Sequence, residues 1–244
     1  MQRLLPDPGP ISVPDAVGGL DLVAQARPER PYVVSNFAIT LDGRATIHGR
    51  SGEIGSDADT QMLVGLRTKV DAVMIGAGTM RTERYGRMLA DSEKRSRRER
   101  EGLAHDPLAV IVSGRLDLPW EAPLFTSGGG RVLIFTSSDA EPPETATSLR
   151  VVRHPDRVDL ADALRYLRVE RGVRALLCEG GPRIHAQLIA AGLVDELFIT
   201  HAPKLVGGEG PTLAVGLPEL ERPLELAWLL EEEGELFARY RVPR

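Results

Sequence analysis

Short apolar runs recur along most of the chain, and each is bounded by glycine, proline or charged residues. The runs are rich in Val, Ile, Leu and Phe, and most are too short for a helix, which is typical of buried strands. The predicted strands cover residues 32–40, 71–76, 107–112, 131–136, 174–179 and 196–202. Two more runs, at 224–232 and 235–242, flank Glu233-Gly234 and predict a C-terminal antiparallel hairpin.

Helical patterns separate several of these strands. Residues 56–59, Ser-Asp-Ala-Asp, form a capping-box pattern and predict a helix that runs to about residue 69. Residues 159–171 carry Leu and Ala at helical spacing, with acidic residues at the start, arginines at the end and Gly172 as a stop. Residues 182–191 predict a third helix that begins at Pro182. This alternation predicts an α/β fold with a mixed, mainly parallel sheet and helices on both faces.

The expected domain organisation is an N-terminal extension, residues 1–30, followed by a single domain, residues 31–244. The extension is rich in Pro and Gly and is expected to be irregular, with at most a short helical turn at 15–25. A chain of 244 residues is long enough to bury a sizeable core.

Composition narrows the class of protein. The chain has 42% hydrophobic and 27% charged residues, which is ordinary for a soluble globular protein. Its net charge of -5 argues against a nucleic-acid partner. The single cysteine, Cys178, excludes an internal disulfide and a cysteine-rich zinc site, and the histidines show no metal-ligand spacing, so no metal is expected. The chain has no apolar stretch long enough for a membrane span, and its proline-rich start does not resemble a signal peptide, so we expect a cytoplasmic protein.

The first candidate binding motif is Gly76-Ala77-Gly78-Thr79, which directly follows a predicted strand. Glycines at such a point let backbone N–H groups approach a phosphate, and a following helix N-terminus favours negative charge. A Rossmann fingerprint is excluded, because Arg81 stands where its third glycine belongs. On this motif alone, a phosphate loop and a tight turn without a ligand both stay open.

The second motif is Glu179-Gly180-Gly181-Pro182, again between a strand and a helix. Glu179 lies at the carboxyl end of its strand, where open α/β sheets bind ligands. The alternative is a plain turn with a solvated Glu179. Two glycine loops of this kind in one chain favour a bound nucleotide with several phosphate contacts.

Two further segments carry candidate polar groups. Asp42-Gly43-Arg44 follows the first predicted strand, and Ser113-Gly114-Arg115 follows the third. A hydroxyl beside a guanidinium suits a phosphate monoester, whereas a surface turn is the alternative for both segments. The charged run at 93–101 is expected to be a solvated loop or an exposed helix, with a phosphate-facing patch as the less favoured alternative.

Taken in order, these motifs resemble the reductase domain of bifunctional riboflavin-biosynthesis proteins, the pyrimidine reductase family. The resemblance covers about residues 31–242. The matching segments are Thr40-Leu41-Asp42-Gly43-Arg44, Leu66-Arg67, Ile75-Gly76-Ala77-Gly78-Thr79, Glu179-Gly180-Gly181, residues 192–196, Ala202-Pro203-Lys204 and Gly207-Gly208. The resemblance implies a dihydrofolate-reductase-like fold and the cofactor NADPH, with hydride transfer to the ribosyl C1′ of a ribosylamino-uracil phosphate.

The resemblance also implies roles for individual residues. The expected contacts of the cofactor phosphates are Gly76, Ala77, Gly78, Thr79, Gly180, Gly181, Pro182, Arg183 and Ile184, and the expected contacts of the 2′-phosphate are Ser113 and Arg115. The predicted substrate ligands are Asn36, Arg44, Ser56, Arg67 and Arg87. Asp42 and Glu179 are the predicted catalytic residues, as candidate proton donors, and the choice between them stays open.

The segments expected to face the substrate depart from the family pattern. Residues 52–56 lack the Trp and the Thr-Gly pair of the family, and residues 81–87 lack its Asp-Asp/Asn-Pro sequence. Separately, the zinc deaminase domain of the bifunctional proteins has no counterpart in this sequence. Two alternatives are therefore kept: reduction of a dihydropteridine such as dihydrofolate, and a nucleotide-binding protein without activity. A homodimer is also expected, because the strand at 196–202 and the C-terminal hairpin offer an apolar edge and the resembled family is commonly dimeric.

Overall fold

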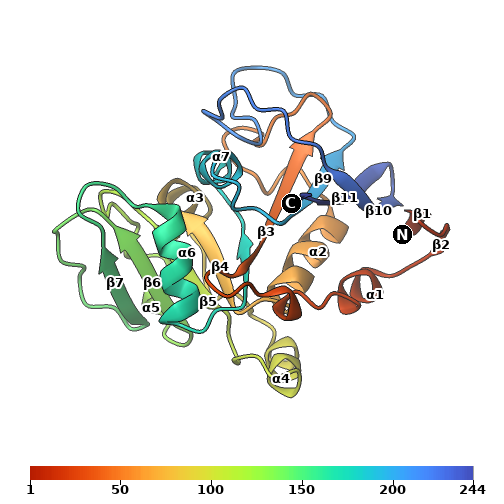
Figure 1. Cartoon of the computed structure of the whole chain (residues 1–244). Coiled ribbons are helices and arrows are strands. Elements are labelled where there is room, and N and C mark those ends of the chain that lie inside the picture. The colour runs from red at the N-terminus through yellow and green to blue at the C-terminus, as the bar shows by residue number, and fades with distance from the viewer. Residues whose placement is uncertain (244) are drawn as a thin grey trace. The chain divides into compact units, whose positions relative to one another are not determined.

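The computed structural model describes residues 1–243, and the chain forms two compact units that are interleaved in sequence. Unit 1 contains Met1–Asp21, Val33–Leu66 and the chain from Cys178 to its C-terminal end. Unit 2 contains Leu22–Tyr32 and Arg67–Leu177. Each unit combines a row of strands with helices (Figure 1).

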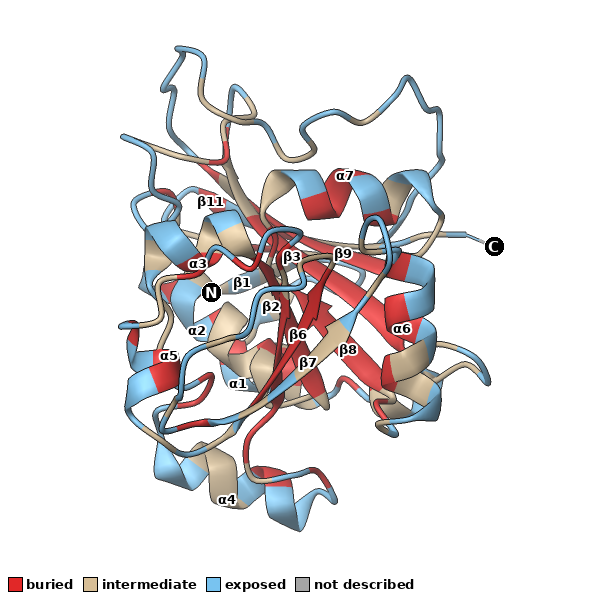
Figure 2. Ribbon diagram, turned by 90° about the vertical axis from the view of Figure 1, so that its left-hand side faces the viewer, coloured by how far each residue is buried: buried red, intermediate tan, exposed pale blue. Residues whose placement is uncertain are grey.

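Unit 1 is built on a row of parallel and antiparallel strands. In spatial order these are β2 (Gly9–Pro10), β1 (Gln2–Leu5), β10 (Glu225–Glu232), β11 (Glu235–Arg241), β9 (Glu196–Ala202) and β3 (Tyr32–Thr40). Strands β3 and β9 are parallel, and each of the other neighbouring pairs is antiparallel. Helices α2 (Asp57–Arg67) and α7 (Pro182–Ala190) cover opposite faces of these strands (Figures 1 and 2).

Unit 2 is a row of mainly buried strands. In spatial order these are β8 (Ala175–Cys178), β4 (Ala72–Gly76), β5 (Leu108–Val112), β6 (Arg131–Thr136) and β7 (Ser148–Arg153). The pairs from β4 to β7 are parallel, so the carboxyl ends of these strands meet at one edge. Helices α3 (Ala77–Glu83) and α6 (Leu160–Val169) lie on opposite faces, and the remaining helices of the unit are η1 (Val23–Gln25), α4 (Ser92–Arg100) and α5 (Pro123–Thr126) (Figure 2).

Local sequence explains why the main helices begin where they do. The Asp159 carboxylate accepts hydrogen bonds from the backbone N–H groups of Ala161 and Asp162, which caps α6. The Ser56 hydroxyl accepts a 3.4 Å hydrogen bond from the N–H of Asp59 at the start of α2. Figure 2 shows that α6 and α7 each present one buried and one exposed face, while the central strands are buried.

The strands and the three main helices predicted from the sequence are confirmed to within two residues at each end, and the C-terminal hairpin is present. Strand β7 and helices α3 and α5 were not located from the sequence, and α4 was expected only as one of two structures for the charged run at 93–101. Residues 1–30 are more regular than expected, because they contain β1, β2, η1 and a helix, α1 (Val13–Gly18). Strand β1 pairs with β10, and Val17 of α1 packs 3.2 Å from the Cβ position of Gly65 in α2. That residues 31–244 form a single domain stays a prediction.

Candidate functional site

The turn after β3 holds Asp42 as a hydrogen-bond acceptor. Its carboxylate accepts the Thr40 hydroxyl at 2.6 Å and the backbone N–H groups of Val206 and Gly207 at 3.2 and 2.7 Å. The hydrogen bond from Thr40, followed by that from Gly207, lowers the pKa of Asp42 to about 2. At neutral pH this side chain is therefore an anion that ties two loops together. Its predicted role as a proton donor finds no support in this geometry.

Arg44 follows in the same turn and is held by the chain. Its Nη1 donates to the Gly210 carbonyl at 2.7 Å, and its Nε lies 4.0 Å from the Asp42 carboxylate. Its Nε is buried and makes no hydrogen bond within residues 1–243. A buried donor without a partner is costly unless a ligand or water completes it, so this atom fits the predicted contact with substrate.

A second polar cluster of unit 1, which sequence reasoning missed, surrounds Asp59 at the start of α2. The Thr200 hydroxyl of β9 donates to its Oδ1 at 2.7 Å. Burial raises the pKa of Asp59 to about 6, against the opposing effect of the hydrogen bond from Thr200, and the nearby Glu235 adds to the rise. The same carboxylate lies where a side chain at Gly55 would be, because a Cβ there would come within 2.3 Å of Oδ2. Asp59 is partly exposed, so its proton can be exchanged.

The sequence does contain a pattern that includes Asp59, the capping box at residues 56–59, but this pattern predicts only the start of a helix. In a capping box the fourth residue reaches back to the first. Here Ser56 does cap the helix, but the Asp59 carboxylate bonds Thr200 instead, across 141 residues of sequence. Ser56, predicted as a substrate ligand, donates its hydroxyl hydrogen to the buried Glu235 of β11.

Asn36 lies on the same face of the unit 1 strands as this cluster. In the parallel β3–β9 pair, Ala38 is beside Thr200 and Asn36 is beside Phe198, and residues two apart project from one face. The Asn36 side chain is buried, and its Oδ1 accepts no hydrogen bond within the described chain. An orphaned amide oxygen on the strand face that also carries Thr200, the partner of a carboxyl of raised pKa, is typical of a binding site.

The Glu179–Pro182 loop of unit 1 lies over a buried histidine. Gly180 has a φ of +95°, and a Cβ there would come within 3.2 Å of the rings of both His185 and Phe37. Burial lowers the pKa of His185 to about 3, and its Nδ1 lies 2.5 Å from the Ser35 hydroxyl. This neutral ring fixes the path of the loop and leaves Glu179 partly exposed. Gly181 and Pro182 then begin α7, Arg183 is exposed and Ile184 is buried.

The Gly76–Thr79 motif of unit 2 joins β4 to α3. Gly76 is buried in extended conformation, while Ala77, Gly78 and Thr79 form the first turn of the helix. Gly78 is exposed, its φ is not positive, and a Cβ there would meet no atom within 4 Å. The protein itself therefore does not require glycine at 78, which fits a position approached by a ligand.

Ser113 and Arg115 follow β5 at the carboxyl edge of unit 2. Ser113 is buried, and its backbone N–H donates to the Phe135 carbonyl at 3.0 Å. Arg115 is exposed, and it makes no hydrogen bond or ion pair within residues 1–243. Its guanidinium is available to an anion.

The two remaining predicted substrate ligands, Arg67 and Arg87, are held by unit 2 itself. Arg67 donates to the Met88 carbonyl at 3.0 Å and stacks 5.6 Å from the centre of the Tyr85 ring. Arg87 makes a bidentate ion pair with the buried Asp106, at 2.9 and 2.5 Å. Both contacts fix the segment before α4, and a role for either guanidinium in binding stays a prediction.

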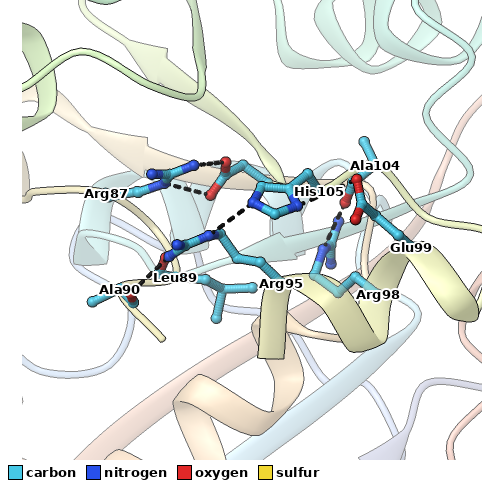
Figure 3. Close-up of polar contacts among 9 residues, drawn as sticks. Arg87, Leu89, Ala90, Arg95, Arg98, Glu99, Ala104 and His105 are labelled. Carbon is cyan, nitrogen blue, oxygen red and sulfur yellow. Dashed lines mark hydrogen bonds and ion pairs between the residues drawn. The ribbon is translucent and has the colours of Figure 1, made fainter. Parts of the chain in front are cut away.

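Helix α4 contains most of the charged run at 93–101, and its arginines hold local structure (Figure 3). Arg98 is buried and donates to the carbonyls of Arg67, Val70 and Ala104. Arg95 donates to the Leu89 and Ala90 carbonyls and to the His105 ring, which also contacts Glu99. The run therefore lies mainly on an exposed helix, in line with the favoured expectation, although Arg98 is buried and bound to the chain rather than solvated.

Comparison with known proteins identifies the family. A family model described as the RibD C-terminal domain matches residues 31–231. The chain belongs to the RibD C-terminal domain family. It is 32% identical over 194 residues to the 2,5-diamino-6-ribosylamino-4(3H)-pyrimidinone 5′-phosphate reductase of Archaeoglobus fulgidus. The aligned residues cover 77% of this chain and 87% of the relative. The enzyme of the same name from Methanothermobacter thermautotrophicus is 30% identical over 210 residues, 81% of this chain and 90% of the relative.

A solved structure supports the same placement in the RibD C-terminal domain family. The crystal structure of a pyrimidine reductase-like protein from Corynebacterium diphtheriae matches with a TM-score of 0.75 and 25% identity, over 96% of this chain and 100% of that one. The resemblance seen in the sequence and the predicted dihydrofolate-reductase-like α/β fold class are thereby confirmed. Within residues 1–243, no helix is long and apolar enough to span a membrane.

Proposed function

We propose that the protein is an NADPH-dependent reductase of a ribosylamino-pyrimidine 5′-phosphate in riboflavin biosynthesis. The observation that carries the proposal is 32% identity to a reductase of that name across 87% of its length. In the proposed reaction, C1′ of the ribosyl group gains a hydride, the bond from C1′ to the ring oxygen breaks, and that oxygen gains a proton. NADPH supplies the hydride, and the protein orients the reactants and supplies the proton.

Features of unit 2 fit the cofactor. Gly78 leaves open the space that a side chain would fill, and Arg115 has a guanidinium without a partner in the described chain. The contact of Arg115 with the 2′-phosphate, and hence a preference for NADPH over NADH, is part of the proposal. Ser113, Gly76, Ala77 and Thr79 complete the proposed cofactor contacts of this unit.

Features of unit 1 fit the reacting end of the substrate. Asn36 and Arg44 each have a buried polar atom without a hydrogen bond inside the described chain. We propose them as substrate ligands. The loop from Gly180 to Ile184 keeps its proposed role in cofactor binding, and the rings of His185 and Phe37 leave no room for a side chain at Gly180.

The proton donor is proposed to be Asp59, with Glu179 as the alternative. A donor must hold a proton near neutral pH and lose it readily. The pKa of Asp59, about 6, meets this requirement, and the pKa of Asp42, about 2, does not. The Asp59 carboxyl also contacts Thr200, which projects from the same strand face as Asn36.

Turnover of the purified protein with NADPH tests the proposal. Three substrates distinguish the proposed function from its alternatives. They are the diaminopyrimidinone phosphate in the names of the relatives, the aminouracil phosphate implied by the sequence resemblance, and dihydrofolate. Loss of reduced-nicotinamide absorbance with either pyrimidine supports the proposal. Loss only with dihydrofolate would instead support the dihydropteridine alternative, and cofactor binding without turnover would support a non-catalytic protein.

Two variants test the cofactor contacts. Gly78→Val should weaken NADPH binding by about tenfold or more, because its side chain would fill the space proposed for the cofactor. The fold should be kept, because a Cβ at this position has no protein atom within 4 Å. Arg115→Ala should weaken NADPH binding about ten- to a hundredfold and leave NADH binding nearly unchanged. An equal loss for both cofactors would exclude Arg115 as the contact of the 2′-phosphate.

We further propose a homodimer. Leu5 of β1, Leu226 of β10 and Leu236 of β11 are exposed apolar side chains in the strand row of unit 1. Burying such residues against a second copy is a common use of an apolar strand surface. Sedimentation of the protein as a monomer at micromolar concentration would refute the dimer and leave the catalytic proposal intact.

A further inference from the structure

Glu235 is a buried carboxylate beside Asp59 that the reaction described above does not use. It is the first residue of β11, and only 3% of its surface is exposed. On β11, Phe237 is paired with Thr200, and Glu235 lies two residues earlier, so Glu235 and Thr200 project from the same face. The side chain is too deeply buried to contact a substrate. Any effect of Glu235 on the reaction must therefore pass through a neighbour.

Ser56 links the Glu235 carboxylate to the backbone of Asp59. Its hydroxyl donates to Glu235 and accepts from the backbone N–H of Asp59. The Asp59 carboxyl itself accepts the Thr200 hydroxyl hydrogen, and Gly55 leaves room for it. The neighbours of this carboxyl thus include a hydroxyl donor, Thr200, and a second acid, Glu235.

Other charged groups nearby are already paired. Arg239 of β11 makes a bidentate ion pair with the buried Glu196, at 2.9 and 2.7 Å. Lys204, which follows β9, donates to the carbonyls of Glu53 and Ile54. His201 projects from the other face of β9, because it follows Thr200 directly. The remaining acids of these elements are Glu53 and Asp57, around the start of α2, and Glu225, Glu231 and Glu232 of β10, of which Glu232 is paired with Glu235 in the hairpin.

We propose that Glu235 is a positioning residue that keeps the Asp59 carboxyl protonated, and so able to donate a proton, in the pH range where the enzyme works. The inference rests on the proposed function, because Asp59 is the donor proposed there. A second negative charge in a partly buried site opposes ionisation of the first. Thr200 acts in the opposite direction, because its hydroxyl stabilises the ionised form. The balance between these two neighbours sets the proton affinity of Asp59.

Glu235→Gln is the direct test. The amide keeps the shape of the side chain and can still accept the Ser56 hydroxyl hydrogen, but it removes the charge. The titration midpoint of Asp59, followed by carbon NMR of labelled Asp carboxyls and assigned with Asp59→Asn, should fall by about 0.5–1 pH unit. The falling limb of the kcat–pH profile should move to lower pH by a similar amount.

The matched control is Glu225→Gln. Glu225 lies at the other end of β10, opposite Arg241, and its substitution changes net charge by the same amount. The control should leave both the Asp59 midpoint and the kcat–pH profile in place. Thr200→Val is the second variant and should move both midpoints upward, because it removes the hydrogen bond that favours the ionised form. Its outcome does not depend on whether the Glu235 variant folds.

The possible results separate clearly. Opposite shifts in the two variants, in both titration and kcat, support the proposal. An Asp59 midpoint that stays within about 0.2 unit in Glu235→Gln, or a midpoint that moves without the kcat limb, overturns it. Failure of the proposed function is recognised separately, since the wild-type protein would then turn over neither pyrimidine, while the NMR midpoints would still test the coupling.

Discussion

Two aspartates of unit 1 begin with the same ordinary pKa and are shifted in opposite directions. Asp42 sits in an open turn and accepts one hydroxyl and two backbone N–H groups from other residues, so its carboxylate is stabilised and its pKa falls to about 2. Asp59, in α2, is largely buried and has a second acid beside it, so its pKa rises to about 6 despite the hydrogen bond from Thr200. The comparison shows that the surroundings, rather than the residue type, decide the role of each acid. Asp42 stabilises two loops as a hydrogen-bond acceptor, and Asp59 can exchange a proton near neutral pH.

The largest expected effect comes from removing the proton of Asp59. Asp59→Asn keeps the shape of the side chain and can accept the Thr200 hydroxyl hydrogen, but it cannot act as an acid. We expect kcat to fall by about a hundredfold or more, the range for a general acid. Asp42→Asn should lower kcat by less than about tenfold, because Asp42 serves as an acceptor. Steady-state kinetics at saturating substrate measures both kcat values. A larger loss of kcat in Asp42→Asn than in Asp59→Asn would contradict the proposed roles of the two aspartates.

Glu179→Gln sharpens the same comparison with a third acid. If Asp59 donates the proton, this variant should raise the substrate KM and lower kcat by no more than about tenfold. Circular dichroism serves as the control for folding, since Glu179 precedes the Gly180 turn that packs on His185 and Phe37. A loss of kcat larger than that of Asp59→Asn would reassign the donor to Glu179.

Most of the fold could be predicted from the sequence because buried parallel strands leave continuous apolar runs. Tyr32–Thr40, Arg131–Thr136 and Glu196–Ala202 were located to the residue for that reason. Strand β7, Ser148–Arg153, was missed because arginines interrupt its apolar residues and none of its residues is fully buried, so it leaves no continuous apolar run. The N-terminal strand β1 was missed because its pairing partner, β10, lies more than 220 residues away in the sequence; Gln2, for example, pairs with Glu231.

The candidate site was predictable only in part, for a related reason. Gly78 and Arg115 stand out locally, since each follows a buried strand at the sheet edge. Asp59 does not, because its role depends on Thr200 and Glu235, which are distant in sequence. Arg87 is a second case: the resemblance implies a substrate contact, which stays a prediction, and nothing in the sequence indicated the bidentate pair with Asp106 that the structure shows.

The two aspartates should also differ in how pH affects stability. The unfolded Asp59 ionises near pH 3.8 and the folded one near 6, so its folded form is increasingly penalised between these values and fully penalised above. Asp59→Asn removes the penalty. We expect it to leave the free energy of unfolding unchanged below about pH 4 and to raise it by about 1–3 kcal/mol at pH 8. Urea denaturation at both pH values measures this, and a variant that is less stable at pH 8 would contradict it.

The smallest expected effect tests the other member of the pair. The pKa of Asp42 is lowered on folding, so its contribution to stability is present above about pH 4 and is lost as pH falls towards 2. Thr40→Val removes the hydroxyl that donates to Asp42 and should raise the pKa of Asp42 towards its ordinary value. We therefore expect the acid-unfolding midpoint to move to higher pH by a fraction of a unit, with kcat at neutral pH nearly unchanged. Since the same hydroxyl also accepts the Arg44 backbone N–H, Asp42→Asn is the matched variant: it should shift the midpoint in the same direction while keeping that second hydrogen bond. If Thr40→Val moves the midpoint and Asp42→Asn does not, the Thr40–Arg44 hydrogen bond is what stabilises this turn against acid, and the contrast between the two aspartates would rest on Asp59 alone.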